Sequence, residues 1–174
     1  MKRASRIAVL LFLAVASTSA AFAAQAPDKP PRKSSAMQLQ SAYPIVVTDK
    51  IAESRDFYRK WFGFEVVFEA SWFVYLTSSE NPAYGIAFMT PEHPSRPPGP
   101  ERFNGRGILL TLQVADAKAE FERLRRAGLS FAHPLTDEPW GQRRFGVIDP
   151  AGVWVDVVQQ TEPAPGFWDK YMKQ

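Results

Sequence analysis

Residues 46–68 read VVTDKIAESRDFYRKWFGFEVVF and join a short apolar strand, an amphipathic helix and a second strand. We expect the first strand at 43–47, the helix at 52–62 and the second strand at 64–69, because the apolar spacing changes from alternating to helical and back. Gly63 follows the helix and favours its termination. The large apolar side chains of the predicted helix fall on one side: Phe57, Tyr58, Trp61 and Phe62.

The same order of elements recurs in the second half of the chain. After further strands at 72–77 and 84–89, the pattern predicts the following second set: a strand at 108–114, a helix at 117–127, and short strands near 129–132, 144–148 and 153–159. Asp49 corresponds to Asp116, and Gly63 to Gly128, in the two halves. The chain is therefore expected to contain two tandem βαβββ units within one α+β domain.

Two stretches carry a resemblance to a known family. Residues 46–68 resemble the opening strand, helix and glycine corner of the vicinal oxygen chelate superfamily, which includes glyoxalases, bleomycin-resistance proteins and extradiol dioxygenases. Residues 137–160, DEPWGQRRFGVIDPAGVWVDVVQQ, resemble its closing hairpin, with the tight turn at 149–152. The resemblance covers about residues 43–160 and implies a curved mixed sheet that forms a cup, with the helices outside.

The N-terminus has the layout of a secretory signal peptide. Lys2 and Arg3 precede an apolar stretch at 7–16, and Ala21-Phe22-Ala23 forms a cleavage pattern. We expect cleavage near Ala23 and export to a periplasm; an uncleaved membrane anchor is the alternative, and the short apolar stretch argues against it. The expected organisation is a signal peptide at 1–23, a flexible tether at 24–41, the domain at 42–161 and a C-terminal helical tail at 162–174.

The apparent basicity of the chain resides in the predicted signal peptide. The whole sequence has 21 basic and 18 acidic residues. Lys2, Arg3 and Arg6 are the basic residues of the segment expected to be removed, so the mature chain has equal numbers of both. We therefore expect no nucleic-acid partner. Because cleavage removes the apolar stretch, we also expect no stable membrane anchor. The chain has 0 cysteines, which excludes disulfides and thiolate metal sites.

The resemblance also implies four metal-ligand positions, one on each of the first, fourth, fifth and eighth strands. These positions are occupied by Ala42, Met89, Leu109 and Asp156. Only the carboxylate is a ligand for a hard metal ion. The two histidines, His93 and His133, lie far apart in the sequence. We therefore predict no bound metal, no cofactor and no catalytic residue.

Strand alternation predicts which side chains line the cup. Leu110 and Leu112 are expected beneath the helices, as are Val153, Val155 and Val157. The residues expected to face the cup are Ala42, Pro44, Val46, Ala87, Met89, Leu109, Thr111, Gln113, Trp154, Asp156 and Val158.

A mostly apolar cup with a few polar groups is typical of a small-molecule site. Asp156 beside Trp154 would favour a cationic or amine-bearing ligand. Alternation does not decide whether Arg143 or Arg144 faces the cup. The predicted ligand-binding residues are Met89, Leu109, Thr111, Trp140, Arg143, Trp154 and Asp156.

Three functions follow from these observations. The first is an exported, metal-free binding protein of the bleomycin-resistance type that sequesters a drug or metabolite. The second is a metal-dependent lyase or dioxygenase of the same superfamily with non-standard ligands. The third is a structural or partner-binding domain, if the cup is filled by its own side chains. The resemblance also implies a homodimer.

Overall fold

The computed structural model describes residues 37, 41–94 and 101–172. The chain divides into two units, Met1–Gln38 and Leu39–Gln174, and the helices and strands of the described residues belong to the second. The predicted signal peptide, residues 1–23, and almost all of the predicted tether lie outside the described residues. Among the described residues, no helix is both long and apolar enough to cross a membrane.

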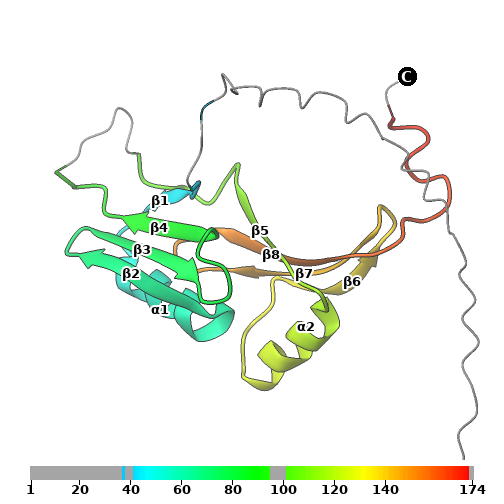
Figure 1. Cartoon of the computed structure of the whole chain (residues 1–174), viewed down its shortest axis with the longest axis horizontal. Coiled ribbons are helices and arrows are strands. Elements are labelled where there is room, and N and C mark those ends of the chain that lie inside the picture. Colours follow the sequence, from blue (N-terminus) through cyan, green and yellow to red (C-terminus); the bar gives the residue numbers. More distant parts are fainter. Residues whose placement is uncertain (1–36, 38–40, 95–100, 173–174) are drawn as a thin grey trace, which may run out of the picture. The chain divides into compact units, whose positions relative to one another are not determined.

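The second unit contains two copies of the same arrangement (Figure 1). The first copy comprises β1 (Ile45–Val47), α1 (Ile51–Phe62), β2 (Phe64–Ala70), β3 (Phe73–Ser78) and β4 (Gly85–Met89). The second comprises β5 (Leu109–Gln113), α2 (Ala117–Arg126), β6 (His133–Glu138), β7 (Gln142–Ile148) and β8 (Trp154–Gln160). The strand orders β1-β4-β3-β2 and β5-β8-β7-β6 are equivalent, with the first and fourth strands of each copy parallel. The predicted α+β fold of two βαβββ units is confirmed.

The helices begin and end where local chemistry favours it. The Asp116 carboxylate accepts a hydrogen bond of 2.9 Å from the Ala119 amide, which satisfies a free donor in the first turn of α2. Helix α1 ends at Phe62, and Gly63 follows with a φ of 67°, a left-handed conformation that glycine adopts without strain. Both helices lie on the same side of the strands (Figure 1).

One continuous apolar core joins the two copies. Helix α1 contributes Tyr58 and helix α2 contributes Leu124, both almost completely buried. The inward side chains of both sheets complete the core, among them Val46, Val74, Leu76, Ile86, Phe88, Phe145, Val147, Val155 and Val157. Because both sheets contribute to the same core, neither copy buries its apolar face alone.

A buried hydrogen bond connects α1 to the turn between β7 and β8. The Tyr58 hydroxyl donates to the Asp149 carboxylate at 3.1 Å, and the Val153 amide donates to the same carboxylate at 2.8 Å. Burial raises the pKa of Asp149 above its usual value, although these donors act in the opposite direction. Burial, followed by the nearby Asp149 charge, also raises the pKa of Tyr58, so the phenol remains a donor.

Two predicted elements are wrong. The predicted strand at 129–132 is a connecting segment, in which Leu129 and Phe131 pack against the core. Its last amide, that of Ala132, donates to the Gly146 carbonyl of β7 at 2.8 Å, and β6 begins at His133. The predicted C-terminal helix is a series of turns over 165–172. Pro165 removes a backbone donor there, and Gly166 has a φ of 72°, which a right-handed helix does not contain.

The predicted side-chain direction is also wrong for the first strand. Val46 lies in the core with only 5% of its surface exposed, rather than in the cup. Its neighbours Ile45 and Val47 pair with Ala87 and Met89 on the other face of the sheet. Because β1 is only 3 residues long, a regular alternation does not extend back to Ala42, and a count from that position assigns the wrong face.

Candidate functional site

Most of the predicted site residues lie on one face of the second sheet, the face that is turned away from α2. We call it the helix-free face. In the strand register, Leu109 pairs with Trp154, and Thr111 pairs with Asp156. Paired residues share a face, and the alternate residues on these strands, such as Val155, lie in the core with α2. The predicted faces of β5 and β8 are therefore confirmed. Whether these residues bind a ligand stays a prediction.

Arg144 is the charged centre of the helix-free face. Its Nε atom donates to Glu138 at 2.8 Å, and its Nη1 atom donates to both Asp156 oxygens at 3.4 and 3.3 Å. The two carboxyl side chains are only 13% and 8% exposed. Burial alone would lower the pKa of Arg144, but hydrogen bonds and charge attraction to Glu138 and Asp156 raise it overall. The guanidinium therefore stays charged between two carboxylates.

Arg143, the arginine named in the predicted ligand-binding set, occupies a different position. It pairs with Asp137 across the β6–β7 ladder and makes an ion pair with it, with Nη2 at 2.9 Å from an Asp137 oxygen. Arg143 and Arg144 are consecutive residues of β7, so they face opposite sides of the sheet. Arg143 faces the same side as the core residue Phe145. Strand alternation in the sequence did not decide which of the two arginines faces the cup. The strand register places Arg144 on the helix-free face.

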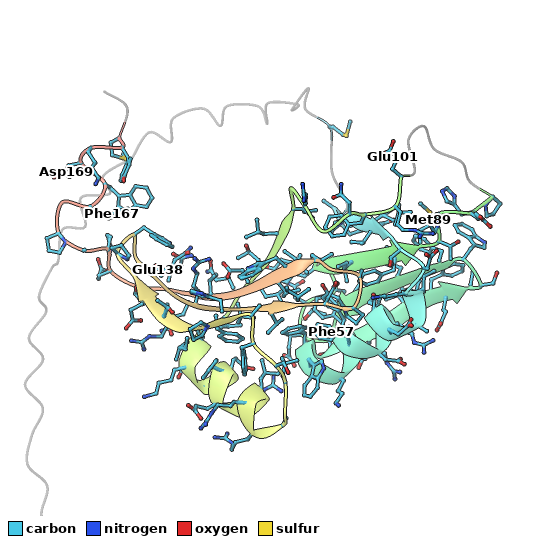
Figure 2. All side chains as sticks on the ribbon, turned by 180° about the vertical axis from the view of Figure 1, so that it is seen from behind. Phe57, Met89, Glu101, Glu138, Phe167 and Asp169 are labelled. Atoms are coloured by element: carbon cyan, nitrogen blue, oxygen red, sulfur yellow. The ribbon has the colours of Figure 1, made fainter. Side chains whose placement is uncertain are left out.

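Trp140 lies in the turn between β6 and β7, as predicted, and its ring covers Arg144. The guanidinium carbon is 5.3 Å from the ring centroid, a cation–π distance. On its other side, Trp140 contacts the C-terminal segment: its ring centroid is 6.3 Å from that of Phe167, and its carbonyl accepts from the Trp168 indole at 3.2 Å. Figure 2 shows Glu138 on the hairpin and Phe167 on the C-terminal segment.

The Trp154 ring covers Gly146 of the neighbouring strand. A methyl group at Gly146 would come within 2.5 Å of the indole, so only glycine leaves room for the ring. The buried Trp154 Nε1 and His133 Nε2 atoms have no hydrogen-bond partner. In the first copy, the Tyr75 ring covers Gly85 in the same manner, at 2.7 Å from the position of a methyl group.

The four positions implied for a metal do not form a metal site. Asp156 and Leu109 lie in the second sheet, whereas Met89 lies in the first and Ala42 forms an isolated bridge with Tyr84. Of the four side chains, only Asp156 offers a ligand for a hard divalent ion. Within the described ranges, no cluster of three or more histidine, cysteine or acidic side chains could hold a metal ion. The residue set does not fit a bound divalent ion.

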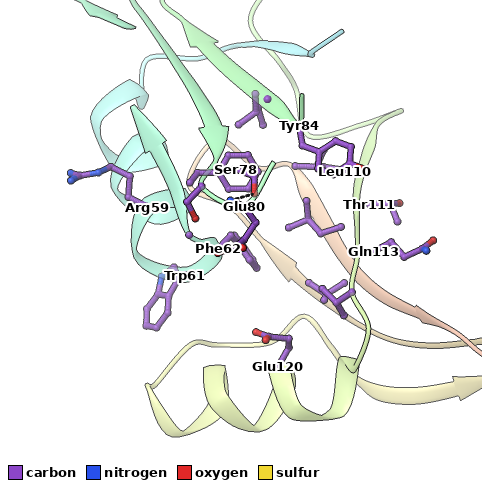
Figure 3. Close-up of a pocket in the computed structure, with 18 of the residues that line it drawn as sticks. Arg59, Trp61, Phe62, Ser78, Glu80, Tyr84, Leu110, Thr111, Gln113 and Glu120 are labelled. Carbon is purple, nitrogen blue, oxygen red and sulfur yellow. Dashed lines mark hydrogen bonds between the residues drawn. The ribbon is translucent and has the colours of Figure 1, made fainter. Parts of the chain in front are cut away.

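A cleft of about 940 Å³ lies between the two copies (Figure 3). The volume is within the range of small-molecule sites. The cleft includes Thr111 and Gln113 of β5, but most of its lining was not predicted, because alternation sorts side chains within one sheet and not between sheets. Other lining residues are Arg59, Lys60, Trp61, Phe62, Glu80, Tyr84, Leu110, Leu112, Glu120 and Arg123.

Comparisons with known proteins agree with this architecture. The model of the Glyoxalase/Bleomycin resistance protein/Dioxygenase superfamily matches residues 40–157, and the chain belongs to this superfamily. A search of curated proteins gave no match.

Several solved structures share the fold. A glyoxalase/bleomycin resistance protein/dioxygenase from Nocardioides has a TM-score of 0.60 and 22% identity, covering 76% of this chain and 91% of that one. A superfamily member from Sphaerobacter thermophilus DSM 20745 has a TM-score of 0.57 and 23% identity, covering 72% and 100%. A virulence protein from Salmonella typhimurium has a TM-score of 0.59 and 15% identity, covering 72% and 100%. These likenesses concern the fold alone.

Proposed function

We propose that this protein is exported and binds a small molecule on the helix-free face without a metal ion. The observation that carries the proposal is Arg144, which is fixed by Glu138, Asp156 and the Trp140 ring at the centre of that face. A charged group held by three partners provides an oriented polar contact, which is what a ligand site requires. Membership of a superfamily that includes bleomycin-resistance proteins supports binding, and the N-terminal signal pattern supports export to a periplasm.

The same residues suggest the chemistry of the ligand. Glu138 and Asp156 together outweigh Arg144 by one negative charge, so a cationic or amine-bearing group is favoured over an anion. Trp140 and Leu109 add apolar surface, and none of the hydrogen bonds within the described residues uses Arg144 Nη2. By contrast, Arg123 in the cleft is already occupied by Glu120 and the Trp61 carbonyl. We therefore infer an aromatic ligand with an amine and an acceptor oxygen.

Leu109→Ala should weaken this binding while leaving the fold intact. Leu109 is 60% exposed, so its truncation costs little stability but removes apolar contact with a ligand on the helix-free face. We expect affinity to fall by about 1–2 kcal/mol, roughly 5- to 30-fold. A thermal-shift screen of aromatic amines identifies a ligand, and calorimetric titration then measures both proteins. Val67→Ala is the control, because Val67 is also 60% exposed but lies on β2. Equal loss of affinity in both variants would contradict the proposed location.

We also propose a homodimer, formed through the outer strands β1 and β5. Both are outer strands of their sheets, and exposed apolar side chains lie on or next to them: Ile45 of β1 is 47% exposed, and Ile108, which precedes β5, is 42% exposed. Exposed apolar groups at the outer strands of a sheet favour association. Light scattering at micromolar concentration should give twice the mass of the mature chain, and Ile45→Lys should reduce it to the single-chain mass. A wild-type protein with the single-chain mass would contradict the dimer.

A further inference from the structure

The C-terminal segment, which follows β8, contacts the tip of the β6–β7 hairpin. The Thr161 amide donates to the Gly141 carbonyl at 2.9 Å. The Ala164 amide donates to the Pro139 carbonyl, also at 2.9 Å. These two hydrogen bonds reach the residues on either side of Trp140. The segment therefore holds the backbone of the turn that carries the Trp140 side chain.

Phe167 is the side chain that connects this segment to the Trp140 ring (Figure 2). Of residues 161–172, it is the one whose surface is partly shielded from solvent, and the others are exposed. Its ring centroid is 6.3 Å from that of Trp140. The neighbouring Trp168 indole lies 5.1 Å from the Phe167 ring and donates to the Trp140 carbonyl at 3.2 Å. Phe167 therefore contacts the ring of Trp140, while Trp168 holds its backbone.

Trp140 in turn covers the guanidinium group at the centre of the helix-free face. The Arg144 guanidinium carbon is 5.3 Å from the centroid of the ring, and the indole Nε1 donates to Gln142 at 2.9 Å. Arg144 and Gln142 belong to the same hairpin as Trp140, whereas Phe167 comes from the C-terminal segment. Packing from a second element restricts the rotamers of a site residue more than contacts within its own hairpin.

We propose that Phe167 is a positioning residue of the ligand site: it holds the Trp140 ring over Arg144, and the ring then favours ligands with an aromatic group. The inference rests on the proposed function. An aromatic ligand on the helix-free face gains a ring contact with Trp140 that an aliphatic ligand lacks. The carboxylates that favour an amine, Glu138 and Asp156, do not depend on Phe167. Its loss should therefore reduce affinity for aromatic amines and leave affinity for aliphatic amines unchanged.

NMR of the Arg144 Nε–H group reports the position of the Trp140 ring without a ligand. This group donates to Glu138, whose side chain is only 13% exposed, so slow exchange keeps its signal observable. The nearby ring shifts the signal, and Trp140→Ala gives its position without a ring. Phe167→Ala should move the signal towards that position, and Phe167→Leu should move it less because an apolar contact remains. Met172→Ala is the control in the same segment; Met172 is 70% exposed, and the signal should not move.

Calorimetric titration with two amines tests the effect on binding. Tyramine has an amine, an oxygen and an aromatic ring, whereas aminohexanol has the amine and the oxygen without a ring. Phe167→Ala should weaken tyramine binding by about 3- to 10-fold, the range of one aromatic contact, and leave aminohexanol binding unchanged.

Phe167 lies outside the apolar core, so its variants should remain folded, and Phe167→Leu serves if the alanine variant does not. A folded variant that retains the wild-type Arg144 signal would overturn the proposal, as would equal losses of affinity for both amines. If the wild-type protein bound neither amine, the proposed function and the selectivity that rests on it would be contradicted. The Arg144 signal would still show whether Phe167 positions the ring.

Discussion

Asp149→Ala is expected to lower the free energy of unfolding by about 2–6 kcal/mol. The substitution removes the acceptor of two buried donors, the Tyr58 hydroxyl and the Val153 amide. Each buried donor left without a partner costs about 1–3 kcal/mol. Because Tyr58 belongs to the first copy and Asp149 to the second, the loss should affect the whole unit and lower the midpoint of its denaturant unfolding curve.

An exposed aspartate provides the control for this experiment. Asp49 is 56% exposed and makes an ion pair with Arg102 at 2.7 Å, so Asp49→Ala should change stability by less than about 1 kcal/mol. Tyr58→Phe tests the pair itself, because adding it to Asp149→Ala should cost less than it does in the wild-type protein. If the two aspartate variants unfold at the same denaturant concentration, the Asp149 contacts do not contribute as described.

Gly141→Ala is expected to lower the free energy of unfolding by about 2–6 kcal/mol, because it introduces backbone strain and a steric clash. Gly141 has a φ of 97°, and a methyl group there would lie 2.8 Å from the Thr161 carbonyl oxygen and 3.0 Å from the Pro163 nitrogen. The Thr161 amide also donates to the Gly141 carbonyl at 2.9 Å. The variant should therefore loosen the β6–β7 hairpin and the C-terminal segment together, which hydrogen exchange and thermal melting measure.

Gly128→Ala distinguishes the effect of backbone strain from that of a steric clash. Gly128 has a similar φ of 89°, but no atom lies within 4 Å of an added methyl group. This variant should lose only about 1–2 kcal/mol. The difference between the two variants measures the contact between the hairpin and the C-terminal segment. Equal losses would mean that the segment moves away freely and does not hold the hairpin.

The sequence predicted the architecture because each half of the chain repeats strong local signals. The stretch at 46–68 has helical apolar spacing followed by Gly63, and α1 forms there. The prediction failed in segments whose apolar residues pack against the core without forming a strand. Phe131 packs against Phe121 at a ring distance of 4.4 Å, so its alternation with Leu129 comes from covering the core and not from strand pairing.

The candidate site was predictable only where strands are regular and one face is wholly apolar. Leu110 and Val155 fix the inward face of β5 and β8, so Asp156 had to face outward from the core. Arg143 and Arg144 are both polar, and their directions depend on the β6–β7 register, which no local pattern specifies. Glu138 was missed for the same reason, since the hairpin brings it to Arg144 from another strand.

The aromatic rings that lie on strand glycines bear on how the two halves have diverged. In the first copy the ring belongs to the third strand and the glycine to the fourth, Tyr75 over Gly85; in the second copy Trp154 is on the fourth strand and Gly146 on the third. The ring that fills the space comes from the third strand in the first copy and from the fourth strand in the second. Aligning the halves position by position would set a glycine-bearing strand against a ring-bearing one. What the two copies share is a filled volume between the third and fourth strands, and the ring and the glycine that fill it stand on opposite strands in the two copies.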